Sequence, residues 1–236
     1  MTVPDKTERD NLEKQIISER WSGDQLQEHL NTTRKFEVLK DPSYIVPKLK
    51  VERGVVYTYK MVKQKNIQEF PDRLYVDHGF YNYKWVDYSP LRLNEGDIVE
   101  TVKNDDGRYS LKRSEKSAKD IYTFKAVLVR YVDADTLWVL VDTGFDSWRL
   151  VELRFRGIDC PEISTPEGQK AKLLVESRLL PCEFIVIKTY WDDKYGRMLV
   201  DVFYKKGEKD PQKLADEGTF LNQELLDNRL AVVWKG

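Results

Sequence analysis

The sequence predicts a mainly β protein with added helices, an α+β protein made of two small barrels behind an N-terminal helical hairpin. From about residue 48 onward, short runs of aromatic and β-branched residues alternate with polar residues and turn signals. The pattern of residues 57–86 also returns 65 positions later, at 122–151. We therefore expect a helical arm over residues 1–47, a degenerate β-barrel repeat over 48–118 and a second barrel over 119–236.

Composition favours an ordered core and argues against a strongly basic binding surface. The 236 residues are 41% hydrophobic and 33% charged, with a formal net charge of −1, so a nucleic-acid partner must be argued from local sites. We expect no membrane span, because no run reaches the roughly 18 apolar residues that one needs. The first ten residues show no signal-peptide pattern, which predicts a cytoplasmic protein whose two cysteines, Cys160 and Cys182, are free thiols.

Residues 5–35 favour two short helices. Leu12 and Ile16 fall at helical spacing, and Ser22 with Gln25 forms a capping-box pattern at the start of the second helix. Two interpretations stay open: an arm that packs on the rest of the protein, or a hairpin that reads DNA. Basic residues do not gather on one face, which favours packing.

The repeat holds one register over about thirty residues. Tyr57-Thr58-Tyr59-Lys60 corresponds to Tyr122-Thr123-Phe124-Lys125, and Val76-Asp77-His78-Gly79-Phe80 to Val141-Asp142-Thr143-Gly144-Phe145. This predicts a duplicated β-meander. Residues 103–119, which are charged and poor in apolar side chains, are expected to form a solvated hairpin or a linker.

The first copy carries an unusual number of aromatic residues, and two interpretations stay open. They could form a ligand cage, or they could be core residues and contacts between the barrels. The residues concerned are Tyr57, Tyr59, Tyr75, Tyr81, Tyr83 and Trp85.

The second copy continues into helices and further strands. Ser164-Thr165-Pro166-Glu167 predicts a helix start, with the helix running to about Leu180. Residues 184–187 and 198–203 predict strands, and residues 221–230 a second helix.

Acidic residues in this half could hold a metal ion. Asp133 and Asp135 are two residues apart at a strand end, so both carboxylates can face one side and repel each other unless a cation lies between them. Asp159 precedes Cys160-Pro161, and Glu162 could activate a water. The alternatives are turn-capping aspartates and a glutamate that stabilises a helix N-terminus.

Arginines near these carboxylates could hold a phosphate. Arg154 lies five positions before Asp159, and Arg197 follows the turn Asp193-Lys194-Tyr195-Gly196. A guanidinium suits phosphate because its donors form a fork and its charge is permanent. The alternative for either arginine is a surface ion pair.

Together these motifs make residues 119–236 resemble the staphylococcal nuclease (thermonuclease) family. The matching motifs are Asp133-Ala134-Asp135-Thr136, Arg154 before Asp159-Cys160-Pro161-Glu162, and Asp193-Lys194-Tyr195-Gly196-Arg197. The resemblance implies an OB-fold barrel that binds one Ca²⁺ through Asp135, Asp159 and the Cys160 carbonyl, with Asp133 acting through water. It implies that Glu162 positions or activates the attacking water and that Arg154 and Arg197 bind the phosphate. It also implies that Lys194 and Tyr195 contact a neighbouring phosphate, while Trp234 could help to hold the base.

We therefore expect a calcium-dependent endonuclease that cleaves DNA and RNA, leaving 3′-phosphate and 5′-hydroxyl ends. The alternative is a nuclease-like module that binds nucleic acid or protein without cutting. In the first copy, Gln68 and Phe70 occupy the places of Asp133 and Asp135. Neither supplies an anionic oxygen, so residues 48–118 are predicted to bind no catalytic metal.

Overall fold

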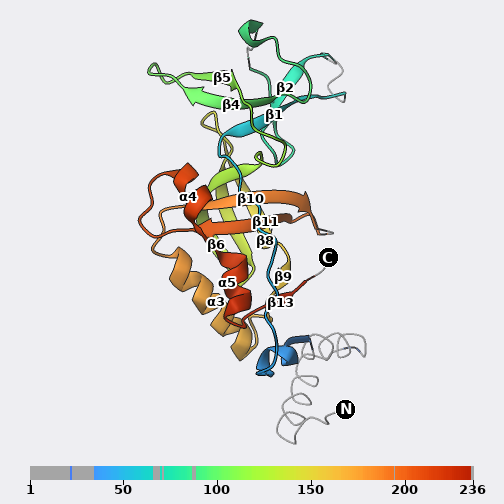
Figure 1. Ribbon diagram of the computed structural model, residues 1–236, viewed down its shortest axis with the longest axis vertical. Helices are drawn as coiled ribbons and strands as arrows, with labels where there is room; N and C mark the ends of the chain where they lie inside the picture. Colours follow the sequence, from blue (N-terminus) through green and yellow to red (C-terminus); the bar gives the residue numbers. More distant parts are fainter. Residues whose placement is uncertain are drawn as a thin grey trace, which may run out of the picture. The chain divides into compact units, whose positions relative to one another are not determined.

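The computed structural model describes Ser22 and residues 35–65, 70, 72–86, 89–193 and 195–234. The chain divides into two compact units, residues 1–45 and 46–236. Apart from Ser22 and Lys35, the helices predicted over residues 5–35 lie outside the described residues. In the first unit the structure describes the 3₁₀ helix η1 (Val38–Lys40). Both sheets belong to the second unit (Figure 1).

A closed five-stranded barrel forms the C-terminal part of the second unit. Strand β10 pairs with both β6 and β11, which closes the order β6-β7-β8-β11-β10. The β8–β11 pairing is parallel and the other pairings in this ring are antiparallel. This topology confirms the predicted mainly β fold with an OB-type barrel. The strands are β6 (Thr123–Asp133), β7 (Thr136–Asp142), β8 (Trp148–Phe155), β10 (Ile185–Asp192) and β11 (Met198–Tyr204).

Three helices and three short strands complete the barrel. In α3 (Pro166–Leu179), Thr165 accepts a hydrogen bond from the Gly168 amide at 3.0 Å, so the predicted helix start is confirmed. Helix α4 was not predicted, although Asp210 is its N-cap and Pro211 is its first residue. The remaining elements are α4 (Pro211–Glu217), α5 (Leu221–Asp227), β9 (Ile158–Asp159), β12 (Thr219–Phe220) and β13 (Val232–Val233).

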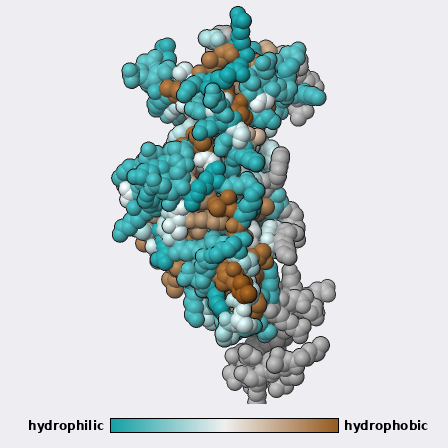
Figure 2. Space-filling model, viewed as in Figure 1, coloured by the Kyte–Doolittle hydropathy of each residue, from teal (hydrophilic) through white to brown (hydrophobic). Residues whose placement is uncertain are grey.

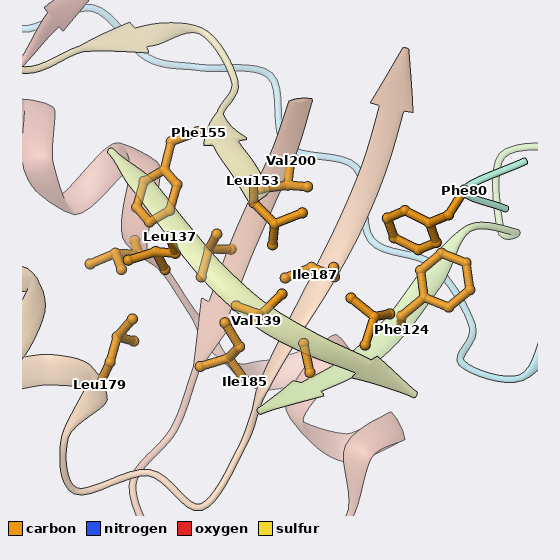
Figure 3. Packing of buried hydrophobic residues seen from close by; sticks show 14 of the residues in the cluster. Phe80, Phe124, Leu137, Val139, Leu153, Phe155, Leu179, Ile185, Ile187 and Val200 are labelled. Carbon is orange, nitrogen blue, oxygen red and sulfur yellow. The ribbon is translucent and has the colours of Figure 1, made fainter. Parts of the chain in front are cut away.

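The barrel interior is filled by alternating apolar side chains. Figure 3 shows such residues of β7, β8, β10 and β11 pointing toward one another, among them Leu137, Val139, Leu153 and Ile187. Phe80 lies in a turn between two strands of the other sheet and packs on Phe124 with ring centroids 5.2 Å apart (Figure 3). The two sheets therefore share one core.

The first sheet has five antiparallel strands in the order β3-β2-β1-β4-β5. Its last two strands form a hairpin over residues 98–113, so the predicted hairpin or linker over 103–119 contains its turn, Asn104–Arg108, and its second strand but little of its first. The aromatic set divides: Tyr59 and Tyr75 are buried, whereas Tyr81, Tyr83 and Trp85 are exposed. The strands are β1 (Thr58–Lys63), β2 (Leu74–Asp77), β3 (Tyr83–Lys84), β4 (Ile98–Lys103) and β5 (Tyr109–Arg113), with the 3₁₀ helix η2 (Ser89–Leu91) before β4.

The first meander (residues 57–86) and the second meander (residues 122–151) follow the same backbone path. Left-handed residues occur at matching positions: Tyr57 and Tyr122 have φ of 58° and 60°, and Phe80 and Phe145 have φ of 52° and 55°. In both turns the aspartate ending the strand accepts a hydrogen bond from the glycine two residues later, at 2.9 and 3.0 Å. This agreement supports the predicted duplication of the β-meander. That one meander arose as a copy of the other stays a prediction.

The two meanders contact each other reciprocally. Tyr57 Oη donates to Asp142 at 2.9 Å, and the corresponding Tyr122 Oη donates to Asp77 at 2.7 Å. Below, these are called the reciprocal pairs. Ring contacts repeat the relation, since Phe80 packs on Phe124 and Phe145 on Tyr59. Each meander thus contributes the same surface, as in an isologous dimer interface.

Hydrophilic side chains cover most of the face of the described chain seen in Figure 2. None of the described helices combines the length and the apolar character needed to cross a lipid bilayer.

Candidate functional site

Three barrel segments bring the predicted site together. Asp135 lies in the tight turn between β6 and β7, Arg154 is the penultimate residue of β8, and Asp159 ends β9. Pairing of Thr136 with Arg154 fixes the first two segments side by side. Pairing of β9 with β13 holds the third.

Arg154 joins the two carboxylates. Its Nη1 pairs with Asp135 and its Nη2 with Asp159. The Arg154 side chain is 12% exposed, and that of Asp135 only 1%. A carboxylate this buried requires a cation or several hydrogen bonds, and here the guanidinium supplies the positive charge.

Backbone and hydroxyl donors fix Asp135 further. The amide of Cys160 donates to Asp135 Oδ2 at 2.7 Å, and Thr136 Oγ1 donates to Oδ1 at 3.2 Å. Asp135 thereby ties the β6–β7 turn to the segment after β9. The arrangement is preorganised, because rigid strands and turns hold each oxygen in place.

The carboxylate oxygens of Asp135 and Asp159 are also the predicted calcium ligands. The carboxylates of Asp135 and Asp159 both reach one guanidinium, so they lie close enough to share one cation. Asp133 instead accepts a hydrogen bond from the Ala134 amide at 2.8 Å. Cys160 is a buried free thiol whose pKa is raised by burial, so its carbonyl rather than its sulfur suits calcium. In the described part of the chain, no three acidic, histidine or cysteine side chains gather as a metal cluster. Calcium binding by these four residues therefore stays a prediction.

Glu162 lies at the exposed edge of this site, two residues after Cys160. Its carbonyl accepts hydrogen bonds from the amide and the hydroxyl of Thr165, at 2.9 and 2.7 Å. Gly168 packs closely against this carbonyl, since a Cβ there would collide with Glu162 and Pro161. The start of α3 thus determines where the Glu162 backbone lies.

Arg197 forms a separate ion pair at the β10–β11 turn. Its Nε donates to Asp193 at 2.8 Å and its Nη2 lies 2.6 Å from the same carboxylate. Burial by itself raises the pKa of Asp193, but hydrogen bonds from Arg197 and Tyr195 outweigh it, so the pKa is lowered. This partner was not predicted, although the spacing of four residues across a turn could have indicated it. Because Met198 and Leu199 pair with Leu153 and Arg154, the turn lies beside the Arg154 strand.

The predicted substrate-binding residues are placed unequally. Tyr195 is 71% exposed, and its ring lies 5.3 Å from the Arg197 guanidinium. Trp234 is half-buried, and its amide donates to the Gly157 carbonyl at 3.0 Å, near Asp159. Lys194 lies outside the described residues.

A second arginine of the same strand region has a structural role. Arg156 makes a two-pronged contact with Asp201, at 2.9 and 2.8 Å, and Asp201 also accepts from the Tyr190 hydroxyl at 3.0 Å. The Asp201 side chain is fully buried, and burial raises its pKa. Arg156 therefore neutralises a buried acid of β11, while Arg154 serves the candidate site.

Comparison with known proteins agrees with the geometry. Residues 152–235 match the model of the family described as staphylococcal nuclease homologue. That range includes Arg154, Asp159, Glu162 and Arg197, whereas Asp135 precedes it. A protein of Capnoides sempervirens, described as an uncharacterized 38.1 kDa protein, is 30% identical over 149 residues. The aligned region covers 57% of this chain and 44% of that protein, so the chain spans less than half of that relative's length. Residues 152–235, the later part of the C-terminal barrel, are therefore similar to a domain of the staphylococcal nuclease type.

Proposed function

We propose that the barrel is a calcium-dependent endonuclease that hydrolyses DNA and RNA phosphodiester bonds. The observation that carries the proposal is the cluster in which Arg154 joins the buried Asp135 to Asp159. Two converging acids and a forked cation, on an OB barrel of this family, are the groups that metal-assisted phosphodiester hydrolysis requires.

Asp135, Asp159 and the carbonyl of Cys160 would hold the calcium ion, with Asp133 acting through a water. When bound, calcium would supply charge that polarises the phosphate and favours ionisation of a nearby water. The Cys160 amide orients Asp135 for this role through its 2.7 Å hydrogen bond. Glu162, exposed at the rim, would accept the proton of the attacking water.

Arg154 and Arg197 would bind the phosphate and stabilise the charge that develops on its oxygens. Both guanidiniums are held by aspartates, at 12% and 28% side-chain exposure, so their donors are oriented before substrate arrives. The new bond joins the water oxygen to phosphorus, and the bond from phosphorus to the 5′ oxygen breaks. The products are a 3′-phosphate and a 5′-hydroxyl that has taken up a proton.

Binding beyond the scissile phosphate would use Lys194 and Tyr195 for a neighbouring phosphate and Trp234 for a base. The exposed ring of Tyr195 and the position of Trp234 near Asp159 support this assignment. Stacking and backbone contacts discriminate poorly among sequences, which fits a substrate class of DNA and RNA together.

The test is a gel assay of the full chain on single-stranded DNA, duplex DNA and RNA, with Ca²⁺ and then with a chelator. Cleavage should require Ca²⁺ and should leave 3′-phosphate ends. Glu162→Gln should reduce the rate about 10²- to 10⁴-fold, as expected for loss of a general base. Glu167→Gln is the matched control, because Glu167 is also an exposed acid at the start of α3.

Two outcomes would contradict the proposal. Cleavage that continues unchanged in chelator would remove calcium from the mechanism. Binding of nucleic acid without cleavage under any condition would favour the alternative, a nuclease-like binding module.

A further inference from the structure

A cavity of about 380 Å³ lies between the first meander and strand β10. Its walls are unusually rich in tyrosine, and acidic and basic side chains complete them. The lining tyrosines are Tyr81, Tyr83, Tyr122 and Tyr190.

The reciprocal pairs explain why this space is open. Around the Tyr57–Asp142 pair, the corresponding region is occupied by Tyr109 of β5. The Tyr109 ring lies 5.2 Å from Phe145, and its hydroxyl donates to Asp146 at 2.8 Å. Around the Tyr122–Asp77 pair, β10 pairs with β6 as β4 pairs with β1, so β11 takes the position that β5 has on the other side. Strand β11 begins with Met198 where β5 begins with Tyr109, and Met198 lines the cavity without contributing a ring.

The filled side indicates what the open side can accept. There, a flat ring that carries a hydrogen-bond donor packs beside a phenylalanine. On the open side, Phe80 takes the place of Phe145 and also lines the cavity. A nucleobase is likewise a flat ring, and its exocyclic amino group is a donor.

Rings at the cavity offer surface for stacking. Tyr81 is 72% exposed and Tyr83 is 36% exposed. Tyr81 Oη donates to Asp192 at 2.8 Å, which holds the ring against β10. Such an anchored, exposed ring loses little side-chain freedom when a base stacks on it.

Polar groups of the cavity suit the edge of a base. Asp77 and Asp192 line it and can accept hydrogen bonds from amino groups. Lys188 also lines it, and its Nζ already donates to the carbonyls of Lys119, at 2.7 Å, and Ile121. Since acids balance the lysines, a phosphate is a poorer match for this cavity than a base.

The cavity also adjoins the proposed phosphate-binding turn. Asp192 ends β10 and Met198 begins β11, and both line the cavity. Arg197 immediately precedes Met198. A nucleic-acid strand whose phosphate contacts Arg197 can therefore place a nearby base in the cavity.

We propose that this cavity is a nucleobase subsite, in which Tyr81 and Tyr83 stack on an unpaired base of the bound strand. This proposal rests on the proposed function, which places a phosphate of the bound nucleic acid at Arg197. A base inserted here must leave its partner, so the subsite favours single-stranded substrate.

The test measures binding of fluorescein-labelled single-stranded DNA octamers to the full chain in chelator by fluorescence anisotropy. Tyr81→Ala and Tyr83→Ala should each weaken binding about 5- to 150-fold, the range for loss of one stacked base. Tyr81→Phe keeps the stacking ring but loses the hydrogen bond to Asp192, so it should weaken binding less than Tyr81→Ala does. Trp148→Ala is the matched control: Trp148 corresponds to Tyr83 in the second meander and is 45% exposed, but it does not line the cavity. Melting temperatures should confirm that each variant is folded.

A series of octamers, each with one abasic position, locates the stacked base. At one position the abasic octamer should bind the original chain and Tyr81→Ala equally, because the stacking partner is already missing. Affinity for intact octamers that is unchanged in both tyrosine-to-alanine variants would overturn the subsite. So would an equal loss in Trp148→Ala, or Tyr81-dependent binding of a trimethyl-lysine peptide in place of DNA.

The cleavage assay separates this proposal from the proposed function. Normal cleavage with no effect of Tyr81→Ala would contradict the subsite alone. Tyr81-dependent binding without cleavage would contradict the proposed activity and leave the subsite standing.

Discussion

The reciprocal pairs allow a symmetric test of how the two meanders are held together. In Tyr57→Phe and in Tyr122→Phe, one phenol hydroxyl is removed and the ring is kept. Each variant loses one hydrogen bond to a carboxylate, Asp142 at 2.9 Å or Asp77 at 2.7 Å. Burial, and then the facing carboxylate, raise the pKa of both phenols, so both hydroxyls remain donors at neutral pH.

The expected cost is nearly the same for the two variants. A hydrogen bond to a charged group contributes about 1.5–3 kcal/mol, and the lower end applies because both tyrosines are partly exposed. A loss of about 1.5 kcal/mol should lower the melting temperature by about 3–6 °C for a chain of this size. Thermal unfolding followed by circular dichroism, together with urea unfolding, measures both quantities.

Tyr131→Phe is the matched control. The Tyr131 hydroxyl is buried and has no hydrogen-bond partner in the described structure, so its removal should be neutral or stabilising. A clear difference between Tyr57→Phe and Tyr122→Phe would refute the reciprocal relation. If both variants unfolded like Tyr131→Phe, the two hydrogen bonds would contribute nothing to the free energy of unfolding.

Three further predictions concern pH, the phosphate clamp and the start of α3. His78 is fully buried between Tyr59 and Phe145, and burial lowers its pKa from 6.5 to about 4. The unfolded chain therefore binds the proton more readily, and the free energy of unfolding should fall by about 2 kcal/mol from His78 as pH drops from 7 to 5. Urea unfolding of His78→Phe should lack this part of the pH dependence; an unchanged pH profile would contradict it. Arg154→Lys keeps the charge but loses the fork, and kcat should fall on the order of 10²-fold or more; a near-normal rate would return Arg154 to a structural ion pair. Gly168→Ala should displace the Glu162 backbone and lower both the melting temperature and kcat, because the added Cβ meets backbone atoms of Glu162 and Pro161; unaltered kinetics in the folded variant would show that this contact does not position Glu162.

Local signals in the sequence were sufficient for much of the barrel. Short apolar runs located the strands that became β10 and β11, and Thr165 with Pro166 marked the start of α3. Such features depend on neighbouring residues, so they can be recognised without knowing the fold. Helix α4 was missed, although Asp210 and Pro211 carry an equivalent capping signal. The two-residue strands β9, β12 and β13 could not be predicted, because so short a segment has no period to recognise.

For the candidate site, the motif spacing identified the residues but not their partners. Arg154 and Arg156 are two residues apart in the sequence, and the resemblance assigned the phosphate to Arg154 alone of the two. Register in the barrel then gave them different roles, since Arg154 joins Asp135 to Asp159 and Arg156 neutralises Asp201. Which acid meets which base depends on pairings between strands far apart in the chain, and no local pattern encodes them.

The repeat shows the same division. Its offset of 65 residues, and therefore the likeness of the two meanders, was determined by the sequence alone. That Tyr57 contacts Asp142 and Tyr122 contacts Asp77, each across to the other meander, was decided only by the tertiary structure. The reason is physical: two similar segments can bury the same apolar surface within themselves or against each other, and only packing of the whole unit selects between these arrangements.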